Sequence, residues 1–299
     1  MSGDLIVAGR TATAVMLDGR KPSTVPGLHR VRRGTYVTES TWRGTRHRER
    51  YELLVRATVP ALRRVAPLAH ESAAVLLGIP VIGPWPSRVR VLEETAAGGR
   101  SSAVVTRHGT RQLPELTVVD DIALTSPART AVDLARTRSF ASGIAAVDHV
   151  LAKGLASRED LEAELEAAKR SPGLRRARLV VAHADERSES VGESLSRAQM
   201  IELGLPVPEL QQEFYDDAGF IGRADFWWPK LRIVGEFDGE VKFVRELHAS
   251  DEDAREALWR EKQREDRLRR QVNGVARWIW DVAMNRNALA RLLAQHGIQ

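Results

Sequence analysis

Apolar residues recur at helical spacing in the segment that begins at Ser190. Val191, Leu195, Ala198 and Ile201 fall on one helix face, because each lies three or four residues from the next. Gly204 and Pro206 follow, and these residue types commonly end helices. The pattern therefore predicts an amphipathic helix that ends before Gly204.

Alternating and compact apolar runs predict four strands after this helix. The strands are expected at residues 211–215, 223–228, 231–238 and 275–280, with Pro229-Lys230 joining the second to the third. Helices are expected from Ser250 or Asp251 to Val272 and over residues 285–295. The C-terminal part, residues 186–299, is therefore predicted to be an α/β domain with the order αβββαβα.

The preceding residues show weaker patterns, from which we expect three further segments. Residues 28–37 alternate as a strand does, and helices are predicted over 48–64, from His70 to Gly78, and over 126–138, 140–153 and 157–169. Short strands are expected at 88–92 and 102–106. The expected segments are 1–45 around the basic strand, a mixed α+β region at 46–155, and a helical connector at 156–185.

Composition excludes several kinds of site and predicts where the protein is located. The sequence has 299 residues and no cysteine, which excludes disulfides and thiolate metal sites. It has no apolar run long enough to span a membrane, and an acid stands near the start where a signal peptide has positive charge. We expect a cytoplasmic protein without a membrane partner.

Positive charge is concentrated near the N-terminus. Residues 10–64 contain 13 Lys and Arg against 4 Asp and Glu, whereas residues 186–299 contain 17 against 21. Such asymmetry is typical of contact with a polyanion. An Arg-rich proteome is the alternative explanation, since only 6 of the 45 basic residues are lysine.

Three acids in the predicted hairpin are candidates for a metal site. If the hairpin loop has two residues, Trp228 pairs with Leu231, and Asp225, Glu236 and Asp238 share one face. Clustered carboxylates repel one another, and a divalent cation would relieve that repulsion. Oxygen ligands favour a hard ion such as Mg²⁺ or Mn²⁺. The alternative is a solvent-facing set of ordinary surface acids.

The same segment resembles a known nuclease family. From Ser188 to Trp280, the chain resembles the Vsr-like branch of the PD-(D/E)XK endonuclease superfamily through the motifs GLPVPELQQ, GRADFWWP, LRIVGEFDGEVKF and ARWIW. The resemblance implies an αβββαβ nuclease core in which Asp225 and Glu236 bind metal and Glu193 assists. Asp238 stands where the family has lysine, and Lys242 is the candidate to replace it.

Two further residue sets have alternative interpretations. Glu193 lies three residues after Ser190, so it also fits a capping box that only stabilises the helix start. Lys262 and Arg264 are candidates for phosphate contact, but their helix also fits a pattern of surface ion pairs such as Glu256 with Arg260.

The N-terminal half resembles a second family. The motifs LHRVRRGTYV, HESAAVLLGIP and TSPARTAVDLA resemble AbiEi-type antitoxins and regulators over about residues 28–155. The resemblance implies a winged-helix segment over 1–45, here shortened because residues 1–27 lack recognition helices. Arg30, Arg32 and Arg33 are then the candidate phosphate contacts, since phosphate contacts position a protein without reading bases.

Together these patterns favour a metal-dependent DNA endonuclease of repair or defence type. The alternative is an antitoxin-like DNA-binding regulator whose nuclease-like domain is silent, with a cognate toxin as a second partner. A purely structural interaction protein is a third hypothesis.

Overall fold

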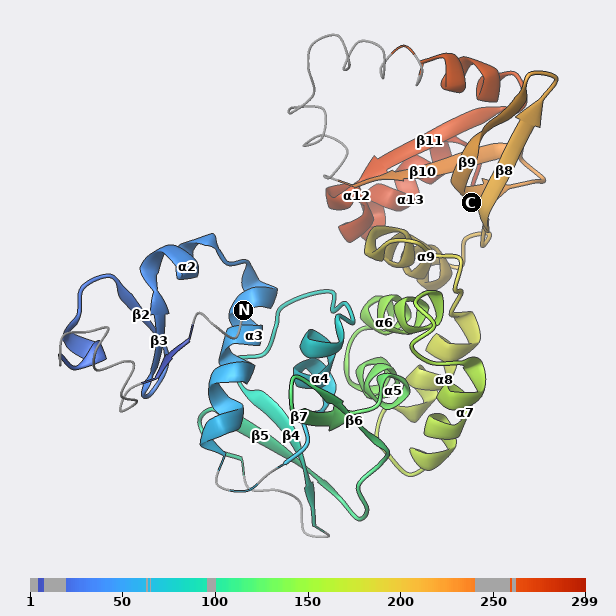
Figure 1. Cartoon of the computed structure of the whole chain (residues 1–299). Helices are drawn as coiled ribbons and strands as arrows, with labels where there is room; N and C mark the ends of the chain where they lie inside the picture. Colours follow the sequence, from blue (N-terminus) through green and yellow to red (C-terminus); the bar gives the residue numbers. More distant parts are fainter. Residues whose placement is uncertain are drawn as a thin grey trace. The chain divides into compact units, whose positions relative to one another are not determined.

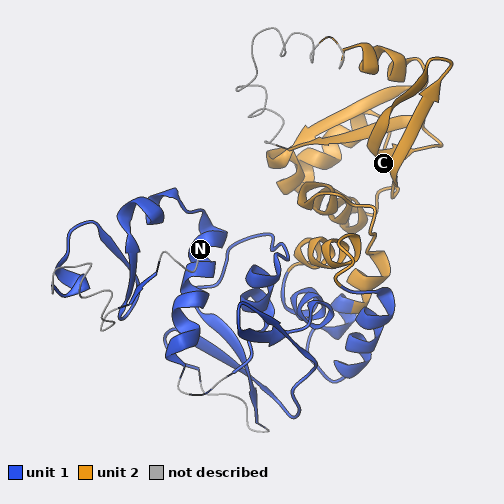
Figure 2. Cartoon of the chain, viewed as in Figure 1, with its two compact units in different colours: residues 1–138, 156–177 blue, residues 139–155, 178–299 orange. Residues whose placement is uncertain are grey.

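The computed structural model describes residues 5–7, 20–62, 64, 66–95, 101–239, 259 and 262–299. The chain forms two compact units, and each is interrupted in sequence (Figure 2). Unit 1 comprises Met1–Arg138 and Ala156–Ala177, and unit 2 comprises Ser139–Leu155 and Arg178–Gln299. This division differs from the sequence-based segments, because it places residues 139–155 with the C-terminal domain.

Unit 1 is a mixed α+β structure (Figure 1). Its strands are β1 (Ile6–Val7), β2 (Leu28–Arg32), β3 (Thr35–Thr38), β4 (Val89–Glu94), β5 (Val105–Thr110), β6 (Leu116–Val119) and β7 (Ile122–Thr125). Its helices are α2 (Glu39–Gly44), α3 (His47–Thr58), α4 (His70–Leu77), α5 (Pro127–Thr137) and α7 (Arg158–Ala167), with 3-10 turns η2 (Pro22–Thr24) and η3 (Val59–Ala61). The β6–β7 hairpin is an element that the sequence patterns did not predict.

Three small sheets organise unit 1. The first has the order β1-β3-β2 and is antiparallel, the second pairs β4 with β5 in parallel, and the third is the β6–β7 hairpin. Leu68 bridges Val91 of β4 and Leu124 of β7, so the second and third sheets share one core. The basic strand predicted at 28–37 is therefore a hairpin, because Arg33 and Gly34 form a turn between β2 and β3.

Unit 2 is built on one four-stranded sheet. Its elements are α6 (Phe140–Ala152), the later part of α8 (Leu174–His183), α9 (Val191–Leu203), β8 (Glu209–Asp216), β9 (Gly219–Trp228), β10 (Ile233–Asp238), helical residues 262–269, β11 (Gly274–Ile279), α12 (Trp280–Met284) and α13 (Arg286–Gln295). The sheet order is β11-β10-β9-β8, in which only β10 and β11 run parallel. The predicted mixed α/β class is confirmed, and the start predicted for the long helix lies outside the described residues.

The hairpin between β9 and β10 differs from the prediction. Trp228 pairs with Ile233 rather than with Leu231, so residues 229–232 form a four-residue loop. Arg232 takes a left-handed conformation (φ 53°) at the end of this loop. A loop longer by two residues keeps the side-chain alternation, so Asp225 and Glu236 still belong to one face although their register is shifted.

Aromatic side chains and small residues pack the sheet tightly. Phe226 stacks against Trp278 at 5.2 Å between ring centroids, and the Trp278 indole donates to Ser196 Oγ of α9 at 2.8 Å. A Cβ on Gly235 would lie 2.8 Å from the Trp278 ring, so only glycine fits there. Trp228 and Trp278 are therefore core residues.

In the described part of the chain, every helix is too short or too polar to cross a lipid bilayer.

Candidate metal and nucleic-acid site

Polar residues form a row across the sheet of unit 2. The register places Gln211 of β8 opposite Asp225 of β9, between the pairs Leu210–Phe226 and Gln212–Ala224. On the other side, Glu236 of β10 pairs with Arg277 of β11. Four neighbouring strands therefore each contribute one polar residue at the same level of the sheet.

Asp225 lies where the backbone pairing of β9 and β10 ends. The last backbone pair is Phe226 with Gly235, and Asp225 Oδ2 then accepts a hydrogen bond from the Phe237 amide at 2.8 Å. The side chain thus takes the place of a strand carbonyl. This bond fixes the carboxylate between the two strands.

Glu193 approaches the row from α9. Its Oε2 accepts hydrogen bonds from the Glu189 amide at 3.0 Å and from Gln211 Nε2 at 2.9 Å, and the residue is only 6% exposed. Burial raises the pKa of Glu193 to about 7, and the negative charge of Asp225 adds to this increase. The Asp225 carboxylate is therefore close enough to oppose the ionisation of Glu193.

The capping interpretation of Glu193 holds in part. Ser190 Oγ accepts from the Glu193 amide at 3.1 Å, which caps α9, but the Glu193 carboxylate bonds the Glu189 amide instead of the Ser190 amide. Its further bond to Gln211 is one that capping does not require. Glu193 thus connects the helix start to the polar row.

Gln211 is a site residue that sequence reasoning missed. Its φ of 55° lies in the left-handed region, which is uncommon for a residue other than glycine inside a strand. Strained backbone of this kind costs about 1–3 kcal/mol and clusters at functional sites. The signal available in the sequence was its place in the GLPVPELQQ motif, because the register opposite Asp225 was not known.

Glu236 is surrounded by arginines. Its Oε1 accepts from Arg264 Nη2 at 3.1 Å and its Oε2 accepts from Arg277 Nε at 2.7 Å, and Glu236 is 7% exposed. Burial lowers the pKa of Arg277, but the charge and hydrogen bond of Glu236, together with the charges of Glu265 and Asp238, outweigh burial and raise the pKa above its usual value. Arg264 thus contacts an acid of the site.

The other predicted residues have different surroundings. Asp238 is half-buried, and its charge contributes to the raised pKa of Arg277. Lys262 is exposed on the helix that carries Arg264. Lys242 lies outside the described residues, so its proposed replacement of the family lysine stays a prediction.

The carboxylate oxygens around Asp225 are of the kind that bind a hard cation. Asp225 and Glu193 are neighbouring carboxylates, and carboxylate oxygens are ligands that hard divalent cations favour. Within the residues that the structure describes, no three His, Asp or Glu side chains are gathered so as to hold an ion. The ligand set of Asp225, Glu236 and Asp238 therefore stays a prediction.

The basic strand of unit 1 presents two of its three candidate arginines. Arg30 and Arg33 are exposed, whereas Arg32 donates from Nη1 to the Ala57 carbonyl of α3 at 2.9 Å. Arg32 therefore stabilises the packing of β2 on α3, and Arg30 and Arg33 are the residues accessible to a phosphate.

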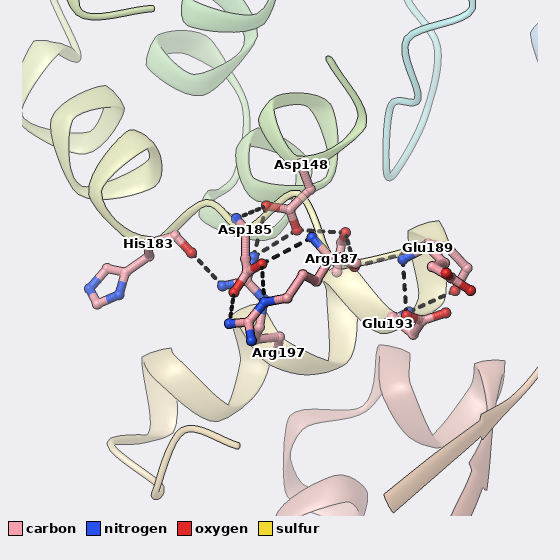
Figure 3. A network of polar contacts seen from close by, with 10 residues as sticks. Asp148, His183, Asp185, Arg187, Glu189, Glu193 and Arg197 are labelled. Carbon is pink, nitrogen blue, oxygen red and sulfur yellow. Dashed lines mark hydrogen bonds and ion pairs between the residues drawn. The ribbon is translucent and has the colours of Figure 1, made fainter. Parts of the chain in front are cut away.

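A buried ion pair fixes α9, the helix that carries Glu193 (Figure 3). Arg197 of α9 binds Asp148 of α6 through Nη2 at 2.7 Å, and Ser194 Oγ donates to the same carboxylate at 2.7 Å. The Asp185 amide donates to Asp148 at 2.8 Å, and Arg197 also donates to the His183 carbonyl. This network, which sequence reasoning missed, explains why α6 belongs to unit 2.

Comparisons with known proteins give two partial relatives. No family model matches the chain. The chain is 36% identical over 114 residues to two uncharacterized proteins, MT2308 and Rv2248, from two strains of Mycobacterium tuberculosis. The match covers 38% of this chain and 42% of each relative, so the chain spans about two fifths of the length of the curated relatives it matches.

Proposed function

We propose that the protein is a metal-dependent DNA endonuclease of repair or defence type, with its ion site at Asp225 and Glu193. The observation that carries this proposal is the position of Asp225. Its carboxylate lies at the fork between two strands, opposite the strained Gln211, with Glu193 held by that same glutamine. The resemblance of residues 188–280 to the Vsr-like PD-(D/E)XK endonucleases supports the same assignment.

Each part of the site has a distinct task in this proposal. A bound Mg²⁺ or Mn²⁺ would supply a hydroxide nucleophile and stabilise charge on a scissile phosphate. Asp225 and Glu193 hold the ion, and Gln211 orients Glu193. Lys262 is exposed and contacts phosphate as a flexible point charge, while Arg264 and Arg277 hold Glu236 in place.

In this proposal, unit 1 supplies the contacts that bind the protein to DNA. Arg30 and Arg33, in the hairpin formed by β2 and β3, contact backbone phosphates and position the protein without reading bases. The relevant compartment is then the cytoplasm, where DNA is accessible to a protein of this kind.

The proposal is tested by cleavage of single-stranded, duplex, mismatched and branched DNA with Mn²⁺ or Mg²⁺. We expect cleavage that EDTA abolishes and that Asp225→Asn reduces at least about 100-fold, the scale of electrostatic contributions to catalysis. Asp217→Asn is the matched control, since Asp217 is an exposed acid in the turn between β8 and β9. Equal activity of the two variants would contradict the site assignment.

A second candidate function is an antitoxin-like, DNA-binding regulator with a silent nuclease domain. It is favoured by the two arginines that already balance the charge of Glu236, and by Asp238 at the family's lysine position. In this case a cognate toxin is a further partner. DNA binding that depends on Arg30 and Arg33, without cleavage of any substrate, would favour the regulator.

A further inference from the structure

Unit 1 contains an open cavity of about 1190 Å³ that is distinct from the carboxylate site. It is lined by His70 at the start of α4, by β5 and the loop that follows it, by α5 and α7, and by the start of α8. All these elements belong to the same compact unit. The volume is enough for a ligand of nucleotide size, since ligand pockets commonly measure about 300–1,000 Å³.

Two imidazoles, one buried and one half-buried, form one wall of the cavity. The rings of His70 and His108 lie 4.3 Å apart between centroids, and His70 is only 5% exposed. His70 Nδ1 and His108 Nε2 are both buried without a hydrogen-bond partner. A buried polar atom without a partner costs about 1–3 kcal/mol in folding free energy. A hydrogen bond from these nitrogens to a ligand would remove that cost.

The backbone of His70 adds a second sign of a built site. Its φ is 51°, in the left-handed region that few residues other than glycine adopt. Burial lowers the pKa of His70 to about 4, and the positive charges of Arg90 and Arg136 contribute to this decrease against the opposing charge of Asp133. The ring is therefore neutral at pH 7 and can donate one hydrogen bond.

Arginines outnumber acids along the rest of the wall. The lining residues include Arg111, Arg129, Arg136, Arg170 and Arg176, against Glu115, Asp133 and Glu164. Asp133 is fully buried and already paired with Arg129 at 2.9 Å and with Arg136 at 2.6 Å. Arg111 and Arg170 are exposed and make no ion pair within the described part of the chain.

We infer that this cavity binds a phosphorylated small molecule of about nucleotide size. Arg111 and Arg170 would bind the phosphate, because guanidinium groups match phosphate oxygens in bidentate geometry. The unpartnered nitrogens of His70 and His108 would bond the polar body of the ligand. This site does not depend on the nuclease proposal, since all its residues lie in unit 1.

Calorimetric titration with AMP, ribose 5-phosphate and inorganic phosphate tests this inference, with adenosine as the uncharged comparison. We expect binding of at least one phosphorylated probe, no binding of adenosine, and at least about a tenfold loss of affinity in Arg111→Ala/Arg170→Ala. Loss of one charge-assisted contact corresponds to about tenfold. Arg175→Ala is the matched control, because Arg175 is exposed in the same helix as Arg176 but does not line the cavity.

Three results would overturn the inference. The first is no binding of any phosphorylated probe at millimolar concentration by the folded protein. The second is binding of duplex or single-stranded DNA that requires Arg111 and Arg170 while the small probes do not bind, which would assign the arginines to nucleic acid. Equal affinity of the double variant and the control would remove the phosphate assignment.

Discussion

Glu193 lies in surroundings that oppose its negative charge. Its carboxyl is buried beside the negative charge of Asp225, and it accepts hydrogen bonds from the Glu189 amide and from Gln211. In the metal-free protein, the raised pKa means that Glu193 keeps its proton in the folded state between about pH 4.5 and pH 7. The unfolded state has already released the proton in that range. The group therefore favours folding below pH 4.5, and this contribution is lost as pH rises through about 7.

Replacing Glu193 by glutamine should consequently stabilise the metal-free protein at high pH. We expect Glu193→Gln to raise the free energy of unfolding by about 1–3 kcal/mol at pH 8, and by less at pH 5, because glutamine carries no charge. Urea unfolding in EDTA at both pH values measures this difference. Glu209→Gln, at an exposed acid of β8, is the control, and a gain that does not depend on pH would contradict the electrostatic explanation.

At the level of elements, α9 is held by the ion pair between Asp148 and Arg197. Both side chains are almost fully buried, and Asp148 also receives bonds from Ser194 and from the Asp185 amide. Removing one partner of such a pair leaves the other charge buried and uncompensated, which costs about 3–5 kcal/mol.

Asp148→Asn should therefore destabilise unit 2 by about 3–5 kcal/mol. The measurement is urea unfolding at pH 7, with Asp217→Asn as the exposed control. A loss below about 1 kcal/mol, the usual scale of an exposed pair, would show that the network does not hold α9 against α6.

The elements of unit 2 could be predicted from the sequence much better than their contacts. The stripe from Val191 to Ile201 identified α9, because helical spacing is a local signal. The β9–β10 register required knowledge of the left-handed turn at Arg232, which no pattern indicated. The four-residue loop has the same parity as the predicted two-residue loop, so the alternation that predicts a shared face for Asp225 and Glu236 is kept.

Partners of side chains were the least predictable feature of the site. Arg264 and Arg277 lie 28 and 41 residues from Glu236, so sequence spacing gave no sign that they meet it. Gln211 and Asp148 were missed for the same reason. In unit 1, the β6–β7 hairpin was missed because its four-residue strands are too short to show periodicity.

Over the whole molecule, the uneven charge bears on DNA binding. Arg30 and Arg33 are exposed on the basic hairpin, whereas Arg32 is engaged with Ala57. Each phosphate contact contributes about −0.9 to the slope of log K against log salt on duplex DNA.

Changing Arg30 and Arg33 to alanine should flatten that slope by up to about 2 units. Fluorescence anisotropy with labelled duplex DNA at several salt concentrations measures the slope. Arg20→Ala is a suitable control, since Arg20 is also exposed in unit 1 but lies outside the hairpin. An unchanged slope in the double variant would locate the DNA contacts elsewhere.

Calorimetric titration of the metal-free protein with Mn²⁺ shows directly whether Asp225 holds a divalent ion. We expect one site in the wild type, a loss of at least about tenfold in affinity in Asp225→Asn and in Glu193→Gln, and unchanged binding in Asp217→Asn. Glu236→Gln in the same titration separates this ligand set from the sequence-based set of Asp225, Glu236 and Asp238. Mn²⁺ binding that is equally strong in Asp225→Asn and the wild type would contradict the claim.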